Sequence, residues 1–120
     1  MAADDKAYQR VLAWQKSEEL AYACFRLAKT FPPQENTLGP ELKRISLRIP
    51  ARVAVAHSLR GKAEAYEVTR EALLAIKELE QLVSFAKRLK YAKDETLDKL
   101  ESLRSEVDWL LNDFYSALSL

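Results

Sequence analysis

The segment from Gly39 to Arg60 constrains the fold most, because its pattern is that of a helix with apolar residues on more than one side. A helix that is apolar nearly all round is normally covered on all sides. In a chain of 120 residues, we expect part of that cover to come from another subunit. The main apolar stripe is Leu38, Leu42, Ile45, Ile49, Val53 and Ala56, and the opposite side carries Leu47, Ala51, Ala54, Val55 and Leu59.

Helical periodicity recurs along the rest of the chain and predicts an all-α fold. Short connections between amphipathic helices favour an antiparallel up-and-down four-helix bundle, with residues 1–120 forming one domain. Met1 to Ala7 is expected to fray. Pro50 is expected to kink its helix without breaking it, because the apolar stripe resumes in phase. The four predicted helices span about 8–30, 39–60, 62–90 and 94–119.

Local chemistry predicts where several of these helices begin and end. Thr37 or Gly39 suits the N-cap of the second helix, with Pro40 in its first turn. Gly61 is expected to adopt the left-handed conformation after that helix. Asp94 is a good N-cap for the last helix.

Several functional classes find no support in the sequence. Cys24 is the only cysteine, so it cannot form an intramolecular disulfide, and its place on an apolar line predicts a buried, inert thiol. His57 is the only histidine, which excludes a metal centre of paired histidines within one chain. No nucleophile is paired with a base, so we predict no enzyme, no cofactor and no metal. The absence of a signal peptide and of a long apolar run predicts a cytoplasmic protein that does not enter a membrane.

Basic residues are concentrated in one segment, although the net charge is only +1. Arg44, Arg48 and Arg52 follow one another at one-turn spacing and could track phosphate groups. The favoured alternative is that they pair with acidic residues of later helices or of a neighbouring subunit. The candidate nucleic-acid contacts are Lys43, Arg44, Arg48, Arg52, Arg60 and Lys62.

Two further groups have a structural interpretation that we favour over a functional one. The second basic group is explained as a solvated helix end, since cations suit a helix C-terminus. Helical spacing places Trp14 among the core residues, and both Trp14 and Trp109 are expected in the core or in a subunit contact rather than stacked on bases. The second basic group comprises Lys87, Arg88, Lys90 and Lys93.

The order and spacing of five short stretches resemble one known family. Taken together, they are similar to the four-helix-bundle intervening-sequence proteins, named for reading frames inside inserts in bacterial large-subunit ribosomal RNA genes. The stretches are Leu12-Ala13-Trp14-Gln15-Lys16 with Glu19-Leu20, Phe31-Pro32, Leu42-Lys43-Arg44, Ile49-Pro50-Ala51-x-Val53-Ala54 and Leu89-Lys90-Tyr91.

The resemblance implies a homopentameric ring and kinship to the accessory proteins of diversity-generating retroelements, which bind nucleic acid and a reverse transcriptase. This chain departs from the family pattern after the Ile-Pro core, where Arg52, Val55 and Ala56 replace the usual Asn, Glu and Gly. Arg48 also stands where a small residue is usual. Any role tied to that polar segment is therefore not carried over to this chain.

The sequence as a whole predicts a non-enzymatic homo-oligomeric scaffold or interaction protein, with Leu47, Ala51, Val55 and Leu59 at the subunit interface. The alternative is a nucleic-acid-binding accessory protein that contacts RNA or DNA through the basic residues of the second helix. A reverse transcriptase or another protein is a partner that only the resemblance implies.

Overall fold

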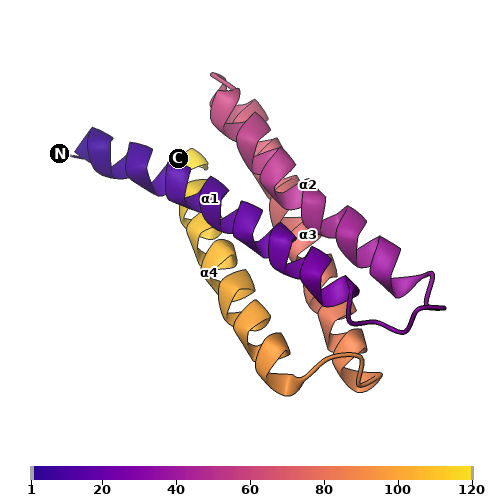
Figure 1. Ribbon diagram of the computed structural model, residues 1–120. Helices are drawn as coiled ribbons and strands as arrows, with labels where there is room; N and C mark the ends of the chain where they lie inside the picture. Colours follow the sequence, from indigo (N-terminus) through magenta and orange to yellow (C-terminus); the bar gives the residue numbers. More distant parts are fainter. Residues whose placement is uncertain (1, 120) are drawn as a thin grey trace.

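The computed structural model describes residues 2–119, which form four helices and no strand. In chain order they are α1 (Ala2–Ala28), α2 (Leu38–Ser58), α3 (Lys62–Arg88) and α4 (Asp94–Leu118). Helices consecutive in the chain pack side by side, and α1 also packs on α4 (Figure 1). Hence α2 lies diagonally opposite α4. The predicted all-α class is confirmed.

The core is a layer of branched aliphatic side chains contributed by all four helices. Burying one such side chain stabilises the fold by roughly 1.5–3 kcal/mol relative to leaving it exposed. Each helix contributes through the stripe that its 3.6-residue period predicts. Among the largest fully buried side chains are Leu20 and Leu27 of α1, Leu42 and Ile49 of α2, Ile76 and Leu79 of α3, and Leu97 and Leu111 of α4.

Three small polar residues are buried inside this apolar layer. Ser17 donates to the backbone oxygen of Trp14 at 2.8 Å, and Ser46 donates to that of Lys43 at 2.9 Å. Thr69 donates in the same way within α3. Because each hydroxyl bonds within its own helix, none is left unpaired at a cost in stability.

Helix α1 begins at Ala2, earlier than the expected start near Tyr8. The predicted start of the first helix is therefore too late, while Met1 lies outside the described residues. The local sequence Ala2-Ala3-Asp4-Asp5 explains the earlier start. Alanine has the best helix propensity, and acidic residues in a first turn favour the helix dipole.

The N-terminus of α2 is capped by a side chain from the preceding loop. Thr37 occupies the N-cap position but makes no capping bond with its own side chain. Instead, the Glu35 carboxylate accepts backbone N–H bonds from Thr37 at 3.0 Å, Leu38 at 2.6 Å and Gly39 at 2.8 Å. These bonds, led by the one from Gly39, lower the pKa of Glu35. Helix α2 then continues through Pro50 to Ser58.

The conformations of two helix ends differ from the predictions. Gly61 is extended, with a φ of −76°, and serves as the N-cap of α3 rather than as a left-handed residue after α2. The left-handed residue is Lys90, with a φ of 59°, which follows the C-cap residue Leu89 of α3. The turn at Lys90 closes with a bond from the Tyr91 N–H to the Ala86 oxygen at 3.1 Å. Asp94 is the first residue of α4, and Lys93 is its N-cap.

Candidate interaction surfaces

The side of α2 that faces away from the bundle is apolar and exposed. Leu47 is 52% exposed and Val55 is 43% exposed, and Ala51 and Ala54 between them are exposed as well. We call these four residues the α2 strip. Leu59, the fourth predicted interface residue, lies after the end of α2 and is half-buried. The sequence pattern therefore located an apolar surface that the rest of the chain does not cover.

The α2 strip continues onto α1. A shallow cavity of about 720 Å³ has Leu47 in its wall together with Tyr22 and Phe25 of α1. Tyr22 is 69% exposed, and Trp14 on the same helix is 39% exposed. Trp14 is therefore not a core residue, and its place in a subunit contact stays a prediction.

Two of the three arginines in the predicted row pair with carboxylates. The Arg52 Nε lies 2.9 Å from the Glu71 Oε2, which joins α2 to α3. The Arg44 Nη2 donates to the Glu41 Oε2 at 2.6 Å within α2, and this guanidinium lowers the pKa of Glu41. Within residues 7–119, Arg48 has no carboxylate within salt-bridge distance.

The other predicted nucleic-acid contacts lie away from that row. The Lys43 Nζ lies 5.8 Å from the centroid of the Phe25 ring, on the side of α2 that faces α1. Arg60 and Lys62 lie beyond the last turn of α2, at the start of α3. The six basic residues therefore do not form one continuous surface within a single chain.

The second basic group lies at the turn between α3 and α4, as its sequence position predicts. Lys90 and Lys93 line a shallow cavity of about 560 Å³ with Thr30 and Tyr91. The Thr30 hydroxyl bonds to the backbone oxygen of Tyr91 at 3.1 Å, which ties the end of α1 to this turn. Phe31 packs on the Tyr91 ring with a centroid distance of 5.1 Å. Trp109 lies elsewhere on α4 and is 63% exposed, so it is not a core residue.

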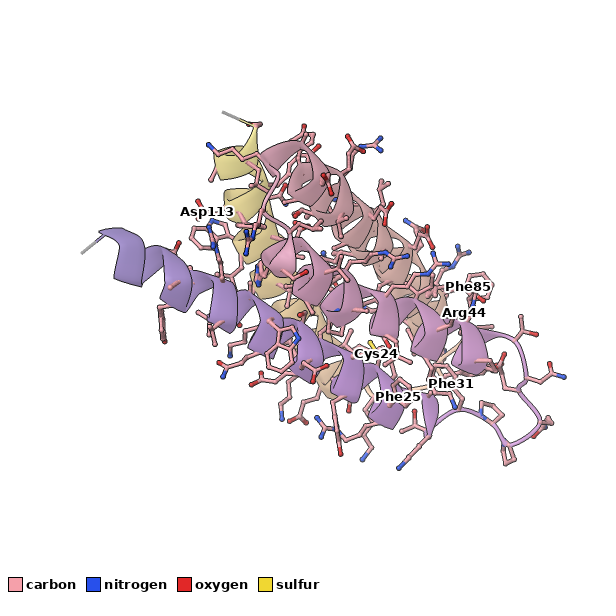
Figure 2. All side chains as sticks on the ribbon, turned by 90° about the horizontal axis from the view of Figure 1, so that it is seen from above. Cys24, Phe25, Phe31, Arg44, Phe85 and Asp113 are labelled. Carbon is pink, nitrogen blue, oxygen red and sulfur yellow. The ribbon has the colours of Figure 1, made fainter. Side chains whose placement is uncertain are left out.

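Cys24 is buried between α1 and α2, as Figure 2 shows. Burial raises the pKa of its thiol to about 12, and a hydrogen bond with Ser46 opposes that shift only in part. The thiol is therefore protonated and unreactive at neutral pH. In the described part of the chain, no group of three or more His, Cys, Asp or Glu side chains could hold a metal ion. None of the four helices over residues 2–119 has the combination of length and apolarity needed to span a membrane.

A cluster that the sequence did not point to lies where the start of α1, the end of α2 and the end of α4 meet. The His57 ring stands edge-on to the Phe114 ring, with centroids 5.0 Å apart and an interplanar angle of 87°. The Arg10 guanidinium lies 5.5 Å from the centroid of the same phenyl ring. Burial and then the Arg10 charge lower the pKa of His57. These residues are far apart in the sequence, so only the tertiary fold brings them together.

Comparison with solved structures finds a protein with the same overall architecture. A solved crystal structure of a protein with unknown function from the S23 ribosomal protein family of Bacteroides thetaiotaomicron has the same fold, with a TM-score of 0.84. The two chains are 20% identical, and the match covers 90% of this chain and 98% of that one. No curated protein matches the sequence.

A family model assigns the chain more directly. The model of the 23S rRNA-intervening sequence protein matches residues 9–113, which include most of α1 and all of α2 and α3. The matched region also contains all five stretches on which the predicted resemblance rests. The chain therefore belongs to the 23S rRNA-intervening sequence protein family.

Proposed function

We propose that this chain is a non-enzymatic, self-associating helical bundle that serves as a scaffold, with the α2 strip at the contact between copies. The single observation that carries the proposal is the exposure of Leu47 and Val55 on a helix whose other side forms the core. Single exposed apolar residues are ordinary, but a continuous exposed patch marks an interaction site. The strip is continuous with exposed Tyr22 on α1, so the patch extends over two helices.

A second copy of the chain is the occupant we propose for this surface. A stable contact needs roughly 800 Å² on each partner, and one face of two adjacent long helices is an area of that order. The assembly we propose is a ring of five, a number supported only by the family resemblance. A closed ring would leave no copy with an uncovered contact surface.

Light scattering after size-exclusion chromatography tests the proposal. Wild-type protein should elute as an oligomer, and Leu47→Asp should shift it to the monomer, because a carboxylate buried in an apolar contact is strongly unfavourable. Helical content measured by circular dichroism should be unchanged, because Leu47 is half exposed in the isolated chain.

The control variant for that experiment is Ser105→Asp, which adds the same charge at an exposed position of α4, the helix diagonally opposite α2. It should stay oligomeric. A wild-type monomer at micromolar concentration, or equal dissociation of both variants, would contradict the proposal.

Nucleic-acid binding is a second candidate function, favoured by the exposure of the arginine row. The side chain of Arg44 is 60% exposed and that of Arg52 is 41% exposed, even though both are paired. Arg48 has no such carboxylate partner among residues 7–119 and is free to contact a phosphate group. An assembly of several copies would multiply this modest charge.

Fluorescence anisotropy with labelled RNA and DNA at several salt concentrations tests the second candidate. Binding should weaken as salt rises, and Arg48→Gln should reduce the salt dependence. Arg70→Gln, an exposed arginine on α3, is the matched control and should bind as the wild type does. No binding to either nucleic acid at low salt would exclude this function. A reverse transcriptase partner is a further proposal that the resemblance alone supports.

A further inference from the structure

A small cavity, which we call the end cavity, lies at the end of the bundle where α2 ends and α3 begins. Its volume is about 230 Å³. Figure 1 shows α1 and α2 diverging at this end. Space of this size holds several water molecules, each of which takes about 30 Å³ in the liquid. The walls come from all four helices and from the link between α2 and α3.

The polar side chains that line the end cavity are all basic or neutral. Arg10 comes from α1, His57 from α2, Arg60 from the link and Lys62 from the first turn of α3. Among the residues that the structure describes, no carboxylate lines it. Moreover, none of the three permanently charged residues forms a salt bridge with any side chain in residues 7–119. Three cations around one cavity raise the local positive potential and favour an anion there.

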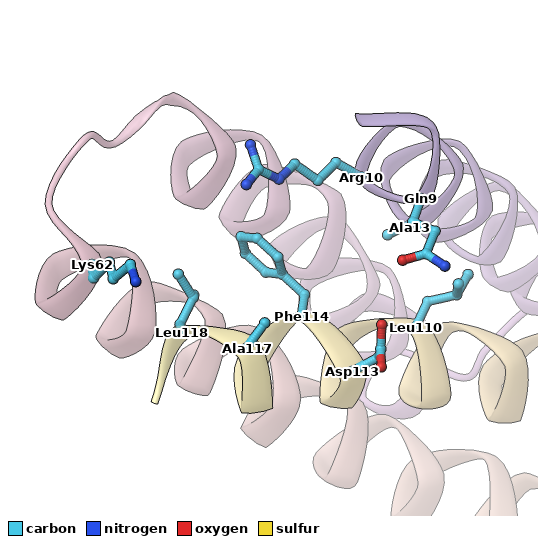
Figure 3. Close-up of a pocket in the computed structure, with 9 residues that line it drawn as sticks. All are labelled: Gln9, Arg10, Ala13, Lys62, Leu110, Asp113, Phe114, Ala117 and Leu118. Carbon is cyan, nitrogen blue, oxygen red and sulfur yellow. The ribbon is translucent and has the colours of Figure 1, made fainter. Parts of the chain in front are cut away.

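The apolar part of the wall fixes how these cations are presented. Phe114 and Leu118 of α4 form one side of the cavity, and they also border a neighbouring cavity of about 180 Å³. Figure 3 shows Arg10 and Lys62 on different sides of Phe114 and Leu118. Among the described residues, the one carboxylate that lines the neighbouring cavity is Asp113, which is exposed. The cations therefore lie beside low-dielectric side chains, where an anion is screened less than in water.

One more feature favours an anion at this position. The Nε2 atom of His57 is buried and has no hydrogen-bond partner among the described residues. Gly61, in the cavity wall, is the N-cap of α3, but the carboxylate of Glu64 in the first turn lies beside it and already faces this helix end. The attraction for an anion therefore comes from the lysine, the arginines and the His57 ring rather than from the helix end.

From this arrangement we infer that the end cavity binds a phosphomonoester group, carried either by a free nucleotide or by the 5′ end of an RNA strand. A phosphomonoester carries about −1.5 to −2 charges near pH 7, which matches a site with three cations better than a single carboxylate does. Arg10 and Arg60 can each donate two parallel N–H bonds to phosphate oxygens, and Lys62 adds a point charge. The site is separate from the α2 strip, so it does not depend on the proposed self-association.

Isothermal titration calorimetry with the full-length protein tests this inference. Adenosine 5′-monophosphate should bind, whereas adenosine should not, because the nucleoside lacks the phosphate group. A short RNA with a 5′-phosphate, compared with the same RNA ending in a hydroxyl, distinguishes the two sources. A preference for the phosphorylated RNA assigns the site to strand ends. Binding of the nucleotide without that preference assigns it to free nucleotides, and both results support the inference.

Lys62→Gln should weaken nucleotide binding about tenfold, because it removes one charge-assisted contact of about 1.4 kcal/mol. Lys77→Gln, an exposed lysine of α3 that does not line the end cavity, is the matched control and should bind as the wild type does. In the wild type, the NMR signals of the His57 ring should shift when the nucleotide is added. The inference is overturned if the nucleotide and the phosphorylated RNA bind no better than their phosphate-free counterparts, or if both lysine variants weaken binding equally.

Discussion

Arg52 and Glu71 form an ion pair that joins α2 to α3, with 2.9 Å between the Arg52 Nε and the Glu71 Oε2. One arginine of the row is thus paired with an acidic residue of a later helix. The sequence favours such pairing over contacts to phosphate groups. The two side chains remain 41% and 56% exposed, so water screens their attraction.

We expect Arg52→Gln to lower the free energy of unfolding by no more than about 1 kcal/mol, because exposed ion pairs contribute little. The loss should shrink further in high salt. Urea denaturation at one protein concentration measures it, and a double-mutant cycle with Glu71→Gln isolates the pair. Arg48→Gln is the control, since Arg48 has no such carboxylate partner within residues 7–119. A coupling energy well above 1 kcal/mol would contradict this prediction.

The sequence predicted the helices and the core well because both depend on a periodic signal. The buried residues Leu42, Ile45, Ile49 and Val53 recur at the spacing of one helix face, and no distant contact is needed to recognise that spacing. The exposed side of α2 could be predicted for the same reason. Leu47 and Val55 are apolar at positions where a surface helix usually carries polar residues.

Helix ends and the end cavity could not be predicted, because they depend on contacts between segments far apart in the chain. The capping bonds of α2 come from the side chain of Glu35, which lies in the preceding loop. The N-cap preferences of Thr37 and Gly39 give no indication of a carboxylate from that loop. The position of His57 in the sequence likewise says nothing about Arg10, which reaches it only because α1 and α2 pack together. Side chains that meet through tertiary structure leave no local pattern.

Because Glu35 caps α2 with its carboxylate, the free energy of unfolding should depend on pH. The pKa of Glu35 in the folded chain is below its ordinary value of 4.5, so the unfolded chain takes up a proton first as the pH falls. The stabilisation by this carboxylate is therefore complete above pH 4.5 and is lost as the pH falls through the folded pKa.

Glu35→Gln should accordingly be less stable than the wild type at pH 7, and the difference should narrow in acid. Denaturation in urea over a series of pH values measures this narrowing. Glu18→Gln serves as the control, because Glu18 is exposed on α1 and makes no hydrogen bond or ion pair with residues 7–119. A difference that stays constant down to low pH would rule out the carboxylate as the source.

The left-handed residue after α3 offers a direct test of backbone strain. Lys90 has a φ of 59°, a conformation that costs an L-residue roughly 1–2 kcal/mol and costs glycine almost nothing. Glycine also gains entropy in the unfolded chain, which offsets part of the benefit. We therefore expect Lys90→Gly to raise the free energy of unfolding by about 0.5–1 kcal/mol.

Lys87→Gly is the matched comparison for Lys90→Gly, because Lys87 lies in the last turn of α3 with helical geometry. Glycine there should lower the stability by about 0.5–1 kcal/mol. The two lysines are three residues apart and both are exposed, so a difference in sign can come only from the backbone. Thermal denaturation of both variants checks this, and two changes of the same sign would contradict a left-handed conformation at Lys90.

His57 should make the stability of the fold fall as the pH drops below neutral. Burial and the nearby Arg10 charge hold its pKa in the folded chain below the ordinary 6.5, so the unfolded chain binds the proton more tightly. The contribution of the neutral His57 ring to stability is then complete above pH 6.5 and declines as the pH falls from that value toward the folded pKa.

His57→Gln removes this dependence, and its unfolding free energy should change less than that of the wild type between about pH 5 and pH 7. Because the chain has one histidine, an NMR titration reports this group alone, and a folded pKa above 6.5 would contradict the prediction. A phosphate group bound in the end cavity should raise that pKa, because a neighbouring anion favours the protonated ring.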